Sequence, residues 1–441
     1  MLRWGHTAFA GCRRHFRSLV RPELADALRT NFSISAPNGV QREALPLALA
    51  GKDVMVCSQT GSGKTLIFLL PILQSLSAKT APPRRKAKRK AGVAERHVAQ
   101  PEALVLVPTR ELGLQVSAVA QQLARELPEA PSTLLVTGGE KFTPQKHALR
   151  RGDVRLLVAT PARLLYHLEQ GTLTLERVRL LAVDEVDAVL CAADGVEREG
   201  EQVIAAIRPQ RGRQKPFGRR PQLMLTAATI SEAHEARIRT CFAPAKLERI
   251  AHRGVLVPTL RQAFHYVRGD KAQELVRLLE RSIADPWLRE GATLIFCAGP
   301  RRAVEVHELL RTAMPQLTVG LLHGETPAQA RTTLLRAFAD DDLRTLVCTD
   351  VVTRGLDFFG VRHVIMYDLP RDVTAFIHRA GRTARRGEDG LVTCLVHPSQ
   401  TSLHKQLTAG EAAGRAERLT YLLTYLLTYL LTYLLTYLLT Y

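Results

Sequence analysis

Two sets of short apolar runs, with helix-length stretches between the runs, constrain the fold of this chain more than any other feature. Such runs, rich in Val, Leu and Ile, are typical of buried strands. Strands that alternate with helices favour a parallel sheet, because a parallel neighbour is reached only through a crossover connection. The sequence therefore predicts an α/β fold with two parallel-sheet domains in tandem. The runs are DVMVCS, ALVLVP, STLLVTG, RLLVAT, LLAVDE and QLMLTA in the first set, and AFHYV, ATLIFC, LTVGLLH, TLVCTD, HVIMYD and GLVTCLV in the second.

Domain boundaries follow from where these runs begin and end. The stretch between the two sets contains Pro244 and Pro258 and shows no clear periodicity, which is typical of a linker. The five predicted segments are a basic N-terminal segment, a first domain, a linker, a second domain and a low-complexity tail, over residues 1–15, 16–245, 246–262, 263–410 and 411–441.

The chain is strongly basic, with 61 Lys and Arg residues against 42 Asp and Glu residues and a formal net charge of +19. This imbalance predicts a polyanionic partner, with nucleic acid favoured over an anionic membrane surface. Two basic stretches, residues 84–90 and 208–220, lie outside the apolar runs. Each is expected to be a solvated loop because like charges repel, and each could also bind RNA or direct localisation.

The seven cysteines form no C-x-x-C pair, and Cys57, Cys297, Cys348 and Cys394 lie within or beside apolar runs. This placement favours buried thiols in a reducing compartment over disulfides or zinc ligands.

The two ends of the chain have unusual compositions. The first twenty-two residues contain five arginines and no acid, which is typical of a transit peptide but also of a simple basic N-terminus. From Leu419 to Tyr441 the chain repeats Leu, Thr and Tyr with a period of four. This run of 23 residues could span a bilayer, but its Thr and Tyr content and its period favour a low-complexity extension. We therefore expect no membrane span.

A glycine-rich motif, CSQTGSGKT at residues 57–65, directly follows the first apolar run. A glycine-rich turn between a strand and a helix aims backbone N–H groups at phosphates. The usual spacing is G-x-x-x-x-G-K-[ST], and here Ser58 stands at the first glycine. We predict a nucleotide-binding loop in which Lys64 contacts the β- and γ-phosphates and Thr65 contacts Mg²⁺.

Two further motifs carry the charges that nucleotide hydrolysis needs. Asp184 and Glu185 end the run LLAVDE, where Asp184 is predicted to hold Mg²⁺, partly through water, and Glu185 to orient or deprotonate the attacking water. A helix N-cap is the alternative role for these acids. The motif HRAGRTARRG, residues 378–387, supplies four arginines that could stabilise charge on the γ-phosphate or could form a cationic surface helix.

Eleven short motifs follow one another along the two predicted domains: GVQ, SQTGSGKT, PTRELGLQ, TGG, TPAR, DEVD, AAT, LIFC, LLHGE, CTDVVTRGLD and HRAGRTARRG. This ordered set resembles the motifs of the DEAD-box ATP-dependent RNA helicases of superfamily 2, over roughly residues 16–400. The resemblance implies two RecA-like domains, a helicase ATP-binding domain and a helicase C-terminal domain, with ATP as substrate, Mg²⁺ as cofactor and RNA as partner.

The resemblance implies a role for each matching residue. Adenine would be recognised by stacking on Phe16 and by the side chain of Gln41. Residues implied to bind the rest of ATP are Ser58, Gln59, Thr60, Gly61, Ser62, Gly63, Lys64, Thr65 and, from the second domain, Asp357, Arg382 and Arg385. Residues implied to grip the RNA backbone are Thr109, Arg110, Gly139, Thr160, Arg163 and Thr349. Residues implied to couple the nucleotide state to RNA binding are Asp187, Ala227, Thr229 and His378. Backbone contacts imply little sequence preference.

Five positions depart from the family's usual pattern. Asn38 replaces a threonine, Ala162 and Ala384 replace glycines, and Val186 replaces an alanine. Ala227 replaces a serine whose hydroxyl would bond toward Asp187, a link worth about 0.5 to 1.5 kcal/mol. The neighbouring Thr226 is expected to point to the other side of its strand. We therefore expect an active ATPase with weakened coupling.

The main functional hypothesis is an RNA-dependent ATPase that separates short RNA duplexes or remodels ribonucleoprotein. The alternative is an ATP-gated RNA clamp or scaffold without productive unwinding; the Gln41 motif and PTREL disfavour a DNA translocase. Three stretches, RQAFHYVRGDKAQELVRLL, RGLDFFGVRHVIMYDLP and LVHPSQTSLHKQL, look most like the animal mitochondrial member of the family linked to assembly of the large mitoribosomal subunit. Mitochondrial localisation, with the nucleus or nucleolus as alternative, ribonucleoprotein partners and a monomeric state are therefore expected.

Overall fold

The computed structural model describes most of the chain between residues 15 and 397. The described ranges are 15–58, 61–77, 98–151, 153–191, 196–207, 220–228, 230, 232–251, 259–352, 360–371, 373–385 and 388–397. Four predicted site residues lie outside them, namely Gln59, Thr60, Thr229 and Asp357. The C-terminal repeat and most of the two basic stretches also lie outside. The chain divides into two compact units, and the main division falls after Arg253.

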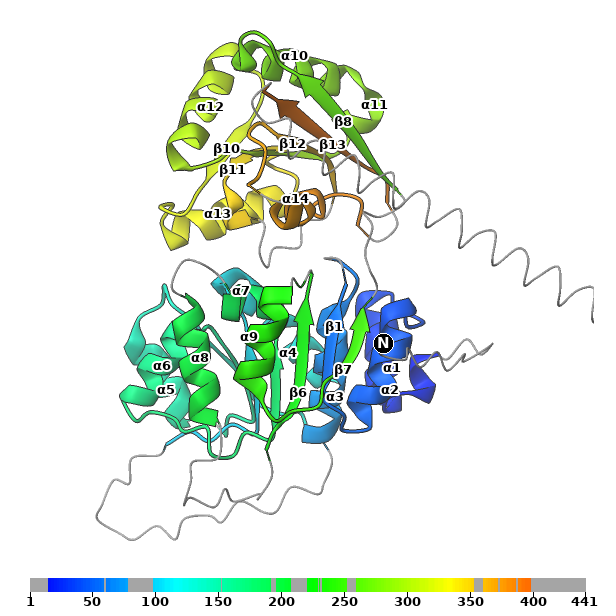
Figure 1. Ribbon diagram of the computed structural model, residues 1–441, viewed down its shortest axis with the longest axis vertical. Coiled ribbons are helices and arrows are strands. Elements are labelled where there is room, and N and C mark those ends of the chain that lie inside the picture. Colours follow the sequence, from blue (N-terminus) through cyan, green and yellow to red (C-terminus); the bar gives the residue numbers. More distant parts are fainter. Residues whose placement is uncertain are drawn as a thin grey trace, which may run out of the picture. The chain divides into compact units, whose positions relative to one another are not determined.

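A parallel sheet forms the centre of the first unit (Figure 1). Among the described residues it has seven strands in the order β3-β4-β2-β5-β6-β1-β7. All carboxyl ends meet at one edge because every neighbouring pair runs parallel. The strands are β1 (Val54–Cys57), β2 (Ala103–Leu106), β3 (Thr133–Val136), β4 (Leu156–Ala159), β5 (Leu180–Val183), β6 (Gln222–Ala227) and β7 (Glu248–Ala251).

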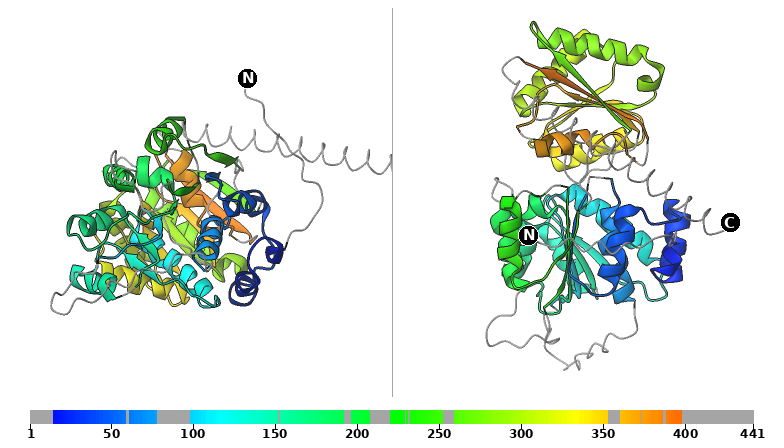
Figure 2. Two further views of the ribbon diagram at one scale, coloured as in Figure 1. Left: turned by 90° about the horizontal axis from the view of Figure 1, so that it is seen from below. Right: turned by 45° about the vertical axis from the view of Figure 1, so that its right-hand side comes forward.

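Helices cover both faces of this sheet, and the right-hand view of Figure 2 shows the blue α1–α3 on one face and the green α9 on the other. The core on the first face is built from α1 to α4, and the core on the second face from α5 to α9. The helical elements are η1 (Phe16–Ser18), α1 (Pro22–Phe32), α2 (Gly39–Leu49), α3 (Lys64–Leu76), α4 (Arg110–Ala124), α5 (Phe142–Arg151), α6 (Pro161–Glu169), α7 (Val186–Cys191), α8 (Val196–Ile207) and α9 (Glu232–Phe242).

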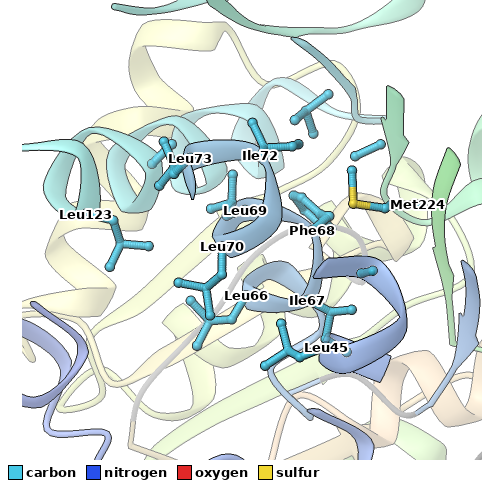
Figure 3. Close-up of a cluster of buried hydrophobic side chains, with 14 of the residues drawn as sticks. Leu45, Leu66, Ile67, Phe68, Leu69, Leu70, Ile72, Leu73, Leu123 and Met224 are labelled. Carbon is cyan, nitrogen blue, oxygen red and sulfur yellow. The ribbon is translucent and has the colours of Figure 1, made fainter. Parts of the chain in front are cut away.

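Helix α3, which follows the phosphate loop, is buried on all sides. Figure 3 shows its side chains from Leu66 to Leu73 packed among Leu45 of α2, Leu123 of α4 and Met224 of β6. A helix that is apolar all round is stable only when neighbours surround it. Truncating one of these leucines to alanine would cost about 2 to 5 kcal/mol, so the helix that starts at the phosphate loop is firmly fixed.

The first unit extends past residue 245, the end predicted for the first domain. Strand β7 lies inside the predicted linker of residues 246–262 and pairs with β1 over all four of its residues. The sequence ERIA is half polar, and its Arg249 and Ala251 are exposed while Ile250 is buried, as expected for an edge strand with one solvated face. It therefore lacks the apolar run that marked the other strands. Strand β8 (Leu260–Tyr266) also begins inside this predicted linker.

The second unit repeats the α/β pattern, which confirms the predicted fold class of two parallel-sheet domains. Its described residues form a parallel sheet in the order β10-β11-β9-β12-β13-β8. Figure 1 shows α10, α11 and α12 over one face and α13 and α14 over the other. The elements are β8, α10 (Lys271–Ala284), α11 (Pro286–Arg289), β9 (Ala292–Phe296), α12 (Pro300–Ala313), β10 (Val319–Leu322), α13 (Ala328–Ala339), β11 (Thr345–Cys348), η2 (Asp350–Val352), β12 (Val361–Met366), α14 (Val373–Ala380) and β13 (Gly390–Val396).

The free thiols are Cys57, Cys241, Cys297, Cys348 and Cys394. Burial raises the pKa of Cys57 to about 11 and the pKa values of Cys297 and Cys394 to about 12. In the described ranges, no helix combines the length and apolar character needed to cross a bilayer.

Candidate functional site

The phosphate loop joins the end of β1 to the start of α3. Its Ser58 N–H donates to the Ala227 carbonyl of β6 at 3.1 Å, and the Ser58 and Ser62 hydroxyls lie 2.6 Å apart. Gly61 and Gly63 have φ angles of 79° and 73°, a left-handed conformation that favours glycine. Lys64 is 8% exposed and its Nζ donates to the Ser58 carbonyl at 2.5 Å. The loop therefore holds its lysine over its own turn.

Asn38 and Gln41 clasp this loop from α2. They form a reciprocal capping box in which each side-chain oxygen accepts the other residue's backbone N–H at 3.0 Å. Their amide nitrogens donate to the loop, Asn38 to the Ser62 carbonyl at 2.7 Å and Gln41 to the Gly63 carbonyl at 3.1 Å. Asn38, a departure from the family pattern, is thus both a helix cap and a contact to the loop. The sequence predicted neither role, although an amide carries both the donor and the acceptor that they require.

Phe16, implied to stack on adenine, is 1% exposed and packs in the core with the residues of α1 to α4. Its ring offers little free face in this conformation, so the stacking role stays a prediction.

Asp184 lies at the carboxyl end of β5 and is almost completely buried. Its Oδ1 accepts the Glu185 N–H at 3.1 Å and the Thr226 hydroxyl at 2.5 Å. Burial raises the pKa of the Asp184 carboxyl, while the Thr226 bond and the nearby Lys64 charge act in the opposite direction. The site therefore keeps an acid where burial opposes its ionisation.

Thr226 lies on the opposite side of β6 from Ala227, as expected, and its hydroxyl reaches Asp184, the first acid of the motif, a contact that the sequence did not predict. Alternation does separate Thr226 from Ala227, but the in-register pairing of β5 with β6 matches Ala182 to Met224 and so brings Asp184 beside Thr226. The register between the two strands, which sequence reasoning did not consider, is the signal that would have found this contact.

Glu185 follows with a φ of 51°, an uncommon left-handed conformation for a residue with a side chain. It is 9% exposed, and Asp187 on α7 is 7% exposed. Val186, which replaces the family's alanine, is fully buried in the core with the residues of α5 to α9. The extra carbons therefore fill core space and leave both acids of the pair in place.

The residues present fit a magnesium ion. Mg²⁺ prefers hard oxygen ligands such as carboxylates and hydroxyls. Both hydrogen bonds that the Asp184 carboxylate accepts go to Oδ1, which leaves Oδ2 to bind a metal or its water. Thr65, the second residue of α3, supplies a half-buried hydroxyl.

Ala227, at the position implied to couple nucleotide and RNA, is completely buried beside Val183 and Val186 in the core. Of the other coupling residues, Asp187 lies on α7 of the first unit and His378 on α14 of the second.

Three motifs implied to grip RNA come together at the same edge of the first sheet. Thr109 caps α4 by accepting the Leu112 N–H at 3.3 Å. Arg110 and Arg163 both reach the loop after β3: an Arg110 Nη1 contact to the Gly139 carbonyl measures 3.5 Å, and Arg163 Nη2 donates to the Glu140 carbonyl at 2.9 Å. Thr160, at the start of α6, donates its N–H to Val136. These arginines therefore share one surface.

In the second unit, the first arginine of HRAGRTARRG is structural. Arg379 is 2% exposed and forms a bidentate ion pair with Asp350, at 2.6 Å from Nε and 2.9 Å from Nη2. Its Nη1 donates to the Asp368 carbonyl at 2.6 Å, and its guanidinium lies 5.3 Å from the Phe296 ring centroid. These bonds tie α14 to the ends of β11 and β12.

The two predicted arginine fingers follow α14. The Nε of Arg382, which is 2% exposed, donates to the His378 carbonyl at 3.2 Å, and the Nε of Arg385 donates to the Gly381 carbonyl at 2.8 Å. Thr349, implied to contact RNA, is buried at the end of β11.

The two alanines at glycine positions differ. Ala384 has a φ of 54°, whereas Ala162, on α6, is not among the residues with positive φ. Replacement of glycine is therefore harmless at Ala162 and strained at Ala384.

Sequence comparison places the chain among known proteins. Residues 38–236 match the DEAD/DEAH box helicase family and residues 270–387 match the helicase conserved C-terminal domain. Probable ATP-dependent RNA helicase DDX28 of Mus musculus is 32% identical over 392 residues, which are 87% of this chain and 69% of that protein. The chain belongs to the DEAD-box helicase family. DEAD-box ATP-dependent RNA helicase 39 of Arabidopsis thaliana is 33% identical over 380 residues, 85% of this chain but only 57% of that relative's length.

Solved DEAD-box structures share the fold. S. cerevisiae Dbp5 bound to RNA and ADP BeF3 matches with a TM-score of 0.73 and 23% identity over 90% of this chain and 93% of its own. Mss116p bound to ssRNA and AMP-PNP matches with a TM-score of 0.75 and 21% identity, over 90% of this chain and 76% of its own. The fold is therefore of the RecA-like helicase type.

Proposed function

We propose that the protein is an RNA-dependent ATPase that separates short RNA duplexes or remodels ribonucleoprotein. One observation carries the proposal: the phosphate loop, the acids Asp184 and Glu185, and the RNA-motif arginines Arg110 and Arg163 all lie at the carboxyl edge of one sheet. Nucleotide binding and strand binding on a single rigid support give a direct physical link between them.

Within the ATP site, each residue has a distinct task. Lys64 would leave the Ser58 carbonyl and contact the β- and γ-phosphates, and the backbone N–H groups of the loop would bind phosphate oxygens. Glu185 would take the proton of the attacking water. Thr65 and Asp184 would hold Mg²⁺, which when bound neutralises charge on the phosphates.

Arginines of the second unit complete the proposed chemistry. Arg382 and Arg385 would stabilise the charge that develops on the γ-phosphate, with Asp357 as a further contact to the nucleotide. Arg379 is excluded from this role because Asp350 and the Asp368 carbonyl already engage its guanidinium.

The RNA contacts proposed for the first unit are made to the sugar-phosphate backbone. Arg110 and Arg163 already share one surface around residues 139 and 140. Binding through phosphates predicts little sequence preference and an affinity that falls steeply with salt.

Coupling between hydrolysis and strand separation is proposed to be weakened by Ala227. A serine there would add a hydroxyl able to bond toward Asp187, worth about 0.5 to 1.5 kcal/mol. Ala227→Ser should therefore raise the number of duplexes separated per ATP hydrolysed, by about two- to tenfold.

Mitochondrial localisation and a role in ribosome assembly are the finer parts of this proposal. They are supported by the arginine-rich, acid-free composition of the first twenty-two residues and by the strong net positive charge. Expression of the full chain with a C-terminal fluorescent protein tests the localisation. Signal confined to the nucleus or nucleolus would overturn it.

The decisive test of the activity measures ATP turnover with and without single-stranded RNA, alongside strand separation of a short RNA duplex. Glu185→Gln is the matched control, because it keeps the size of the side chain and removes the base. The proposal predicts turnover stimulated by RNA, strand separation that requires ATP, and loss of both in Glu185→Gln. ATP turnover that is the same with and without RNA would refute the proposed function.

A further inference from the structure

Tyr166 is an exposed aromatic residue on the surface where the RNA motifs of the first unit meet. It is 43% exposed, one of five large hydrophobic side chains that the described residues leave exposed. It lies one helical turn after Arg163 on α6, so the two side chains share a face of that helix. Arg163 contacts the carbonyl of Glu140, two residues before Phe142, which links this face to the start of α5.

The ring of Tyr166 packs against the ring of Phe142, which in turn packs against the ring of His167. Its centroid lies 5.0 Å from that of Phe142 in an edge-to-face arrangement, and Phe142 in turn lies 4.8 Å from the buried ring of His167. The His167 nitrogens are engaged at 2.8 Å by Thr172 and at 3.1 Å by Gln145. Burial lowers the pKa of His167 to about 4, so its imidazole ring stays neutral under physiological conditions.

Gln145 joins the aromatic group to the RNA motif TGG. Its Nε2 donates to the Thr137 carbonyl at 2.9 Å and to Glu140 at 3.1 Å. The loop implied to bind the RNA backbone and the aromatic rings are therefore held by the same buried amide. A strand lying on this loop would be presented to the rings at a fixed position.

The charge around the rings suits a polyanion. Helix α5 contains no acid, and its cations include Lys146, whose Nζ lies 5.7 Å from the Phe142 ring centroid. Two acids lie close to this group in the chain: Glu140, which pairs with Arg110 at 3.5 Å and accepts a hydrogen bond from Gln145, and the exposed Glu169 at the end of α6. The cations Lys146, Arg150, Arg151 and Arg163 outnumber these acids on α5 and α6. An exposed ring flanked by cations is the arrangement by which proteins stack bases of single-stranded nucleic acid.

We propose that Tyr166, supported by Phe142, stacks on a base of single-stranded RNA that extends beyond the backbone-binding residues of the first unit. The inference rests on the proposed function, because it requires RNA on this surface. Stacking engages the face of any base, so it would add affinity without adding sequence preference.

The test uses the full-length protein and single-stranded RNA of about ten nucleotides, a length matched to binding channels of this kind. One base at a time is replaced by the fluorescent base 2-aminopurine, whose emission is quenched by stacking. We expect quenching at one position with the natural protein. Tyr166→Ala and Tyr166→Leu should abolish that quenching and weaken RNA binding about tenfold, whereas Tyr166→Phe should retain both.

Two controls separate stacking from other effects. Tyr266→Ala removes a tyrosine of the second unit that is 54% exposed and should change nothing. The slope of affinity against salt should be unchanged in Tyr166→Ala and shallower in Lys146→Ala, because only lysine releases counterions. Thermal melting of each variant shows whether it is folded.

Natural affinity and quenching in Tyr166→Ala and Tyr166→Leu would overturn the inference, as would a Tyr166→Phe variant that binds as weakly as Tyr166→Ala. Failure of the natural protein to bind RNA at all would instead refute the proposed function, so the two failures are distinguishable.

Discussion

The two ends of the first sheet hold buried acids in opposite ways. At the amino ends of the strands, the Glu102 carboxylate accepts hydrogen bonds from Nε of Arg155 at 2.8 Å and from Nε of Arg179 at 3.1 Å. Although burial alone would raise its pKa, these two arginines lower the pKa of Glu102. At the carboxyl ends, burial raises the pKa of Asp184, and a hydroxyl and a backbone N–H hold its carboxylate.

This difference shows what each end is for. An acid whose pKa is lowered by folding stabilises the fold at neutral pH, whereas an acid whose pKa is raised lowers the stability of the fold there. The charged groups at the amino end therefore stabilise the fold. The carboxyl end holds a buried acid that lowers the stability of the fold, a Glu185 with a left-handed backbone conformation and a lysine whose Nζ bonds to its own loop. Strained and destabilising groups of this kind are typical of ligand-binding and catalytic sites.

The largest predicted effect comes from a substitution at the carboxyl end of the sheet, in the phosphate loop. Lys64→Met keeps most of the aliphatic stem but removes the charge that would contact the phosphates. We expect ATP turnover to fall by about 10²- to 10³-fold, with little change in the free energy of unfolding. Steady-state ATP hydrolysis and urea unfolding measure the two quantities. A variant that hydrolyses ATP normally would show that the phosphates bind elsewhere.

The next largest effect comes from a substitution at the amino end of the sheet. Glu102→Gln leaves Arg155 and Arg179 without their carboxylate and should lower the free energy of unfolding by about 2 kcal/mol at pH 7. Since folding lowers the pKa of Glu102, its contribution is full above the ordinary pKa of 4.5 and disappears as the pH falls through the folded value. Unfolding curves of the natural protein and the variant should therefore converge in acid. Parallel curves at every pH would contradict this assignment.

A smaller effect sharpens the role of the contact that sequence reasoning missed. Thr226→Val preserves shape and removes the hydroxyl that donates to Asp184, a bond worth about 1 kcal/mol. We expect ATP turnover to fall about fivefold, while Thr226→Ser, which keeps the hydroxyl, retains it. Equal turnover in the valine and serine variants would mean that the bond is only structural.

The smallest effect lies outside the comparison and serves as its reference. Ala384→Gly removes the left-handed strain of an alanine with a φ of 54°. The free energy of unfolding of the second unit should rise by about 0.5 to 1 kcal/mol, less than the loss expected in Glu102→Gln. Thermal melting measures this, and a lower melting temperature would show that the backbone tolerates alanine there.

The sequence was most informative where a pattern repeats and least informative where strands meet. Each of the twelve predicted apolar runs overlaps a strand, since strands buried inside an α/β sheet need mostly apolar residues. Strand β7 was missed since ERIA is half polar, as an edge strand with one solvated face permits.

At the site, motif spacing predicted the phosphate loop and the acids, since both are local in the chain. The contacts of Thr226 with Asp184 and of Asn38 with Ser62 join residues far apart in sequence. They depend on strand register and loop conformation, which no local pattern records.

The most direct test of the contrast replaces one acid at each end by its amide. Asp184→Asn and Glu102→Gln are compared for ATP turnover per folded molecule and for the free energy of unfolding. The account predicts that Asp184→Asn loses turnover while its stability is unchanged or higher, and that Glu102→Gln keeps turnover while its stability falls. Loss of stability in Asp184→Asn with turnover intact would contradict the account.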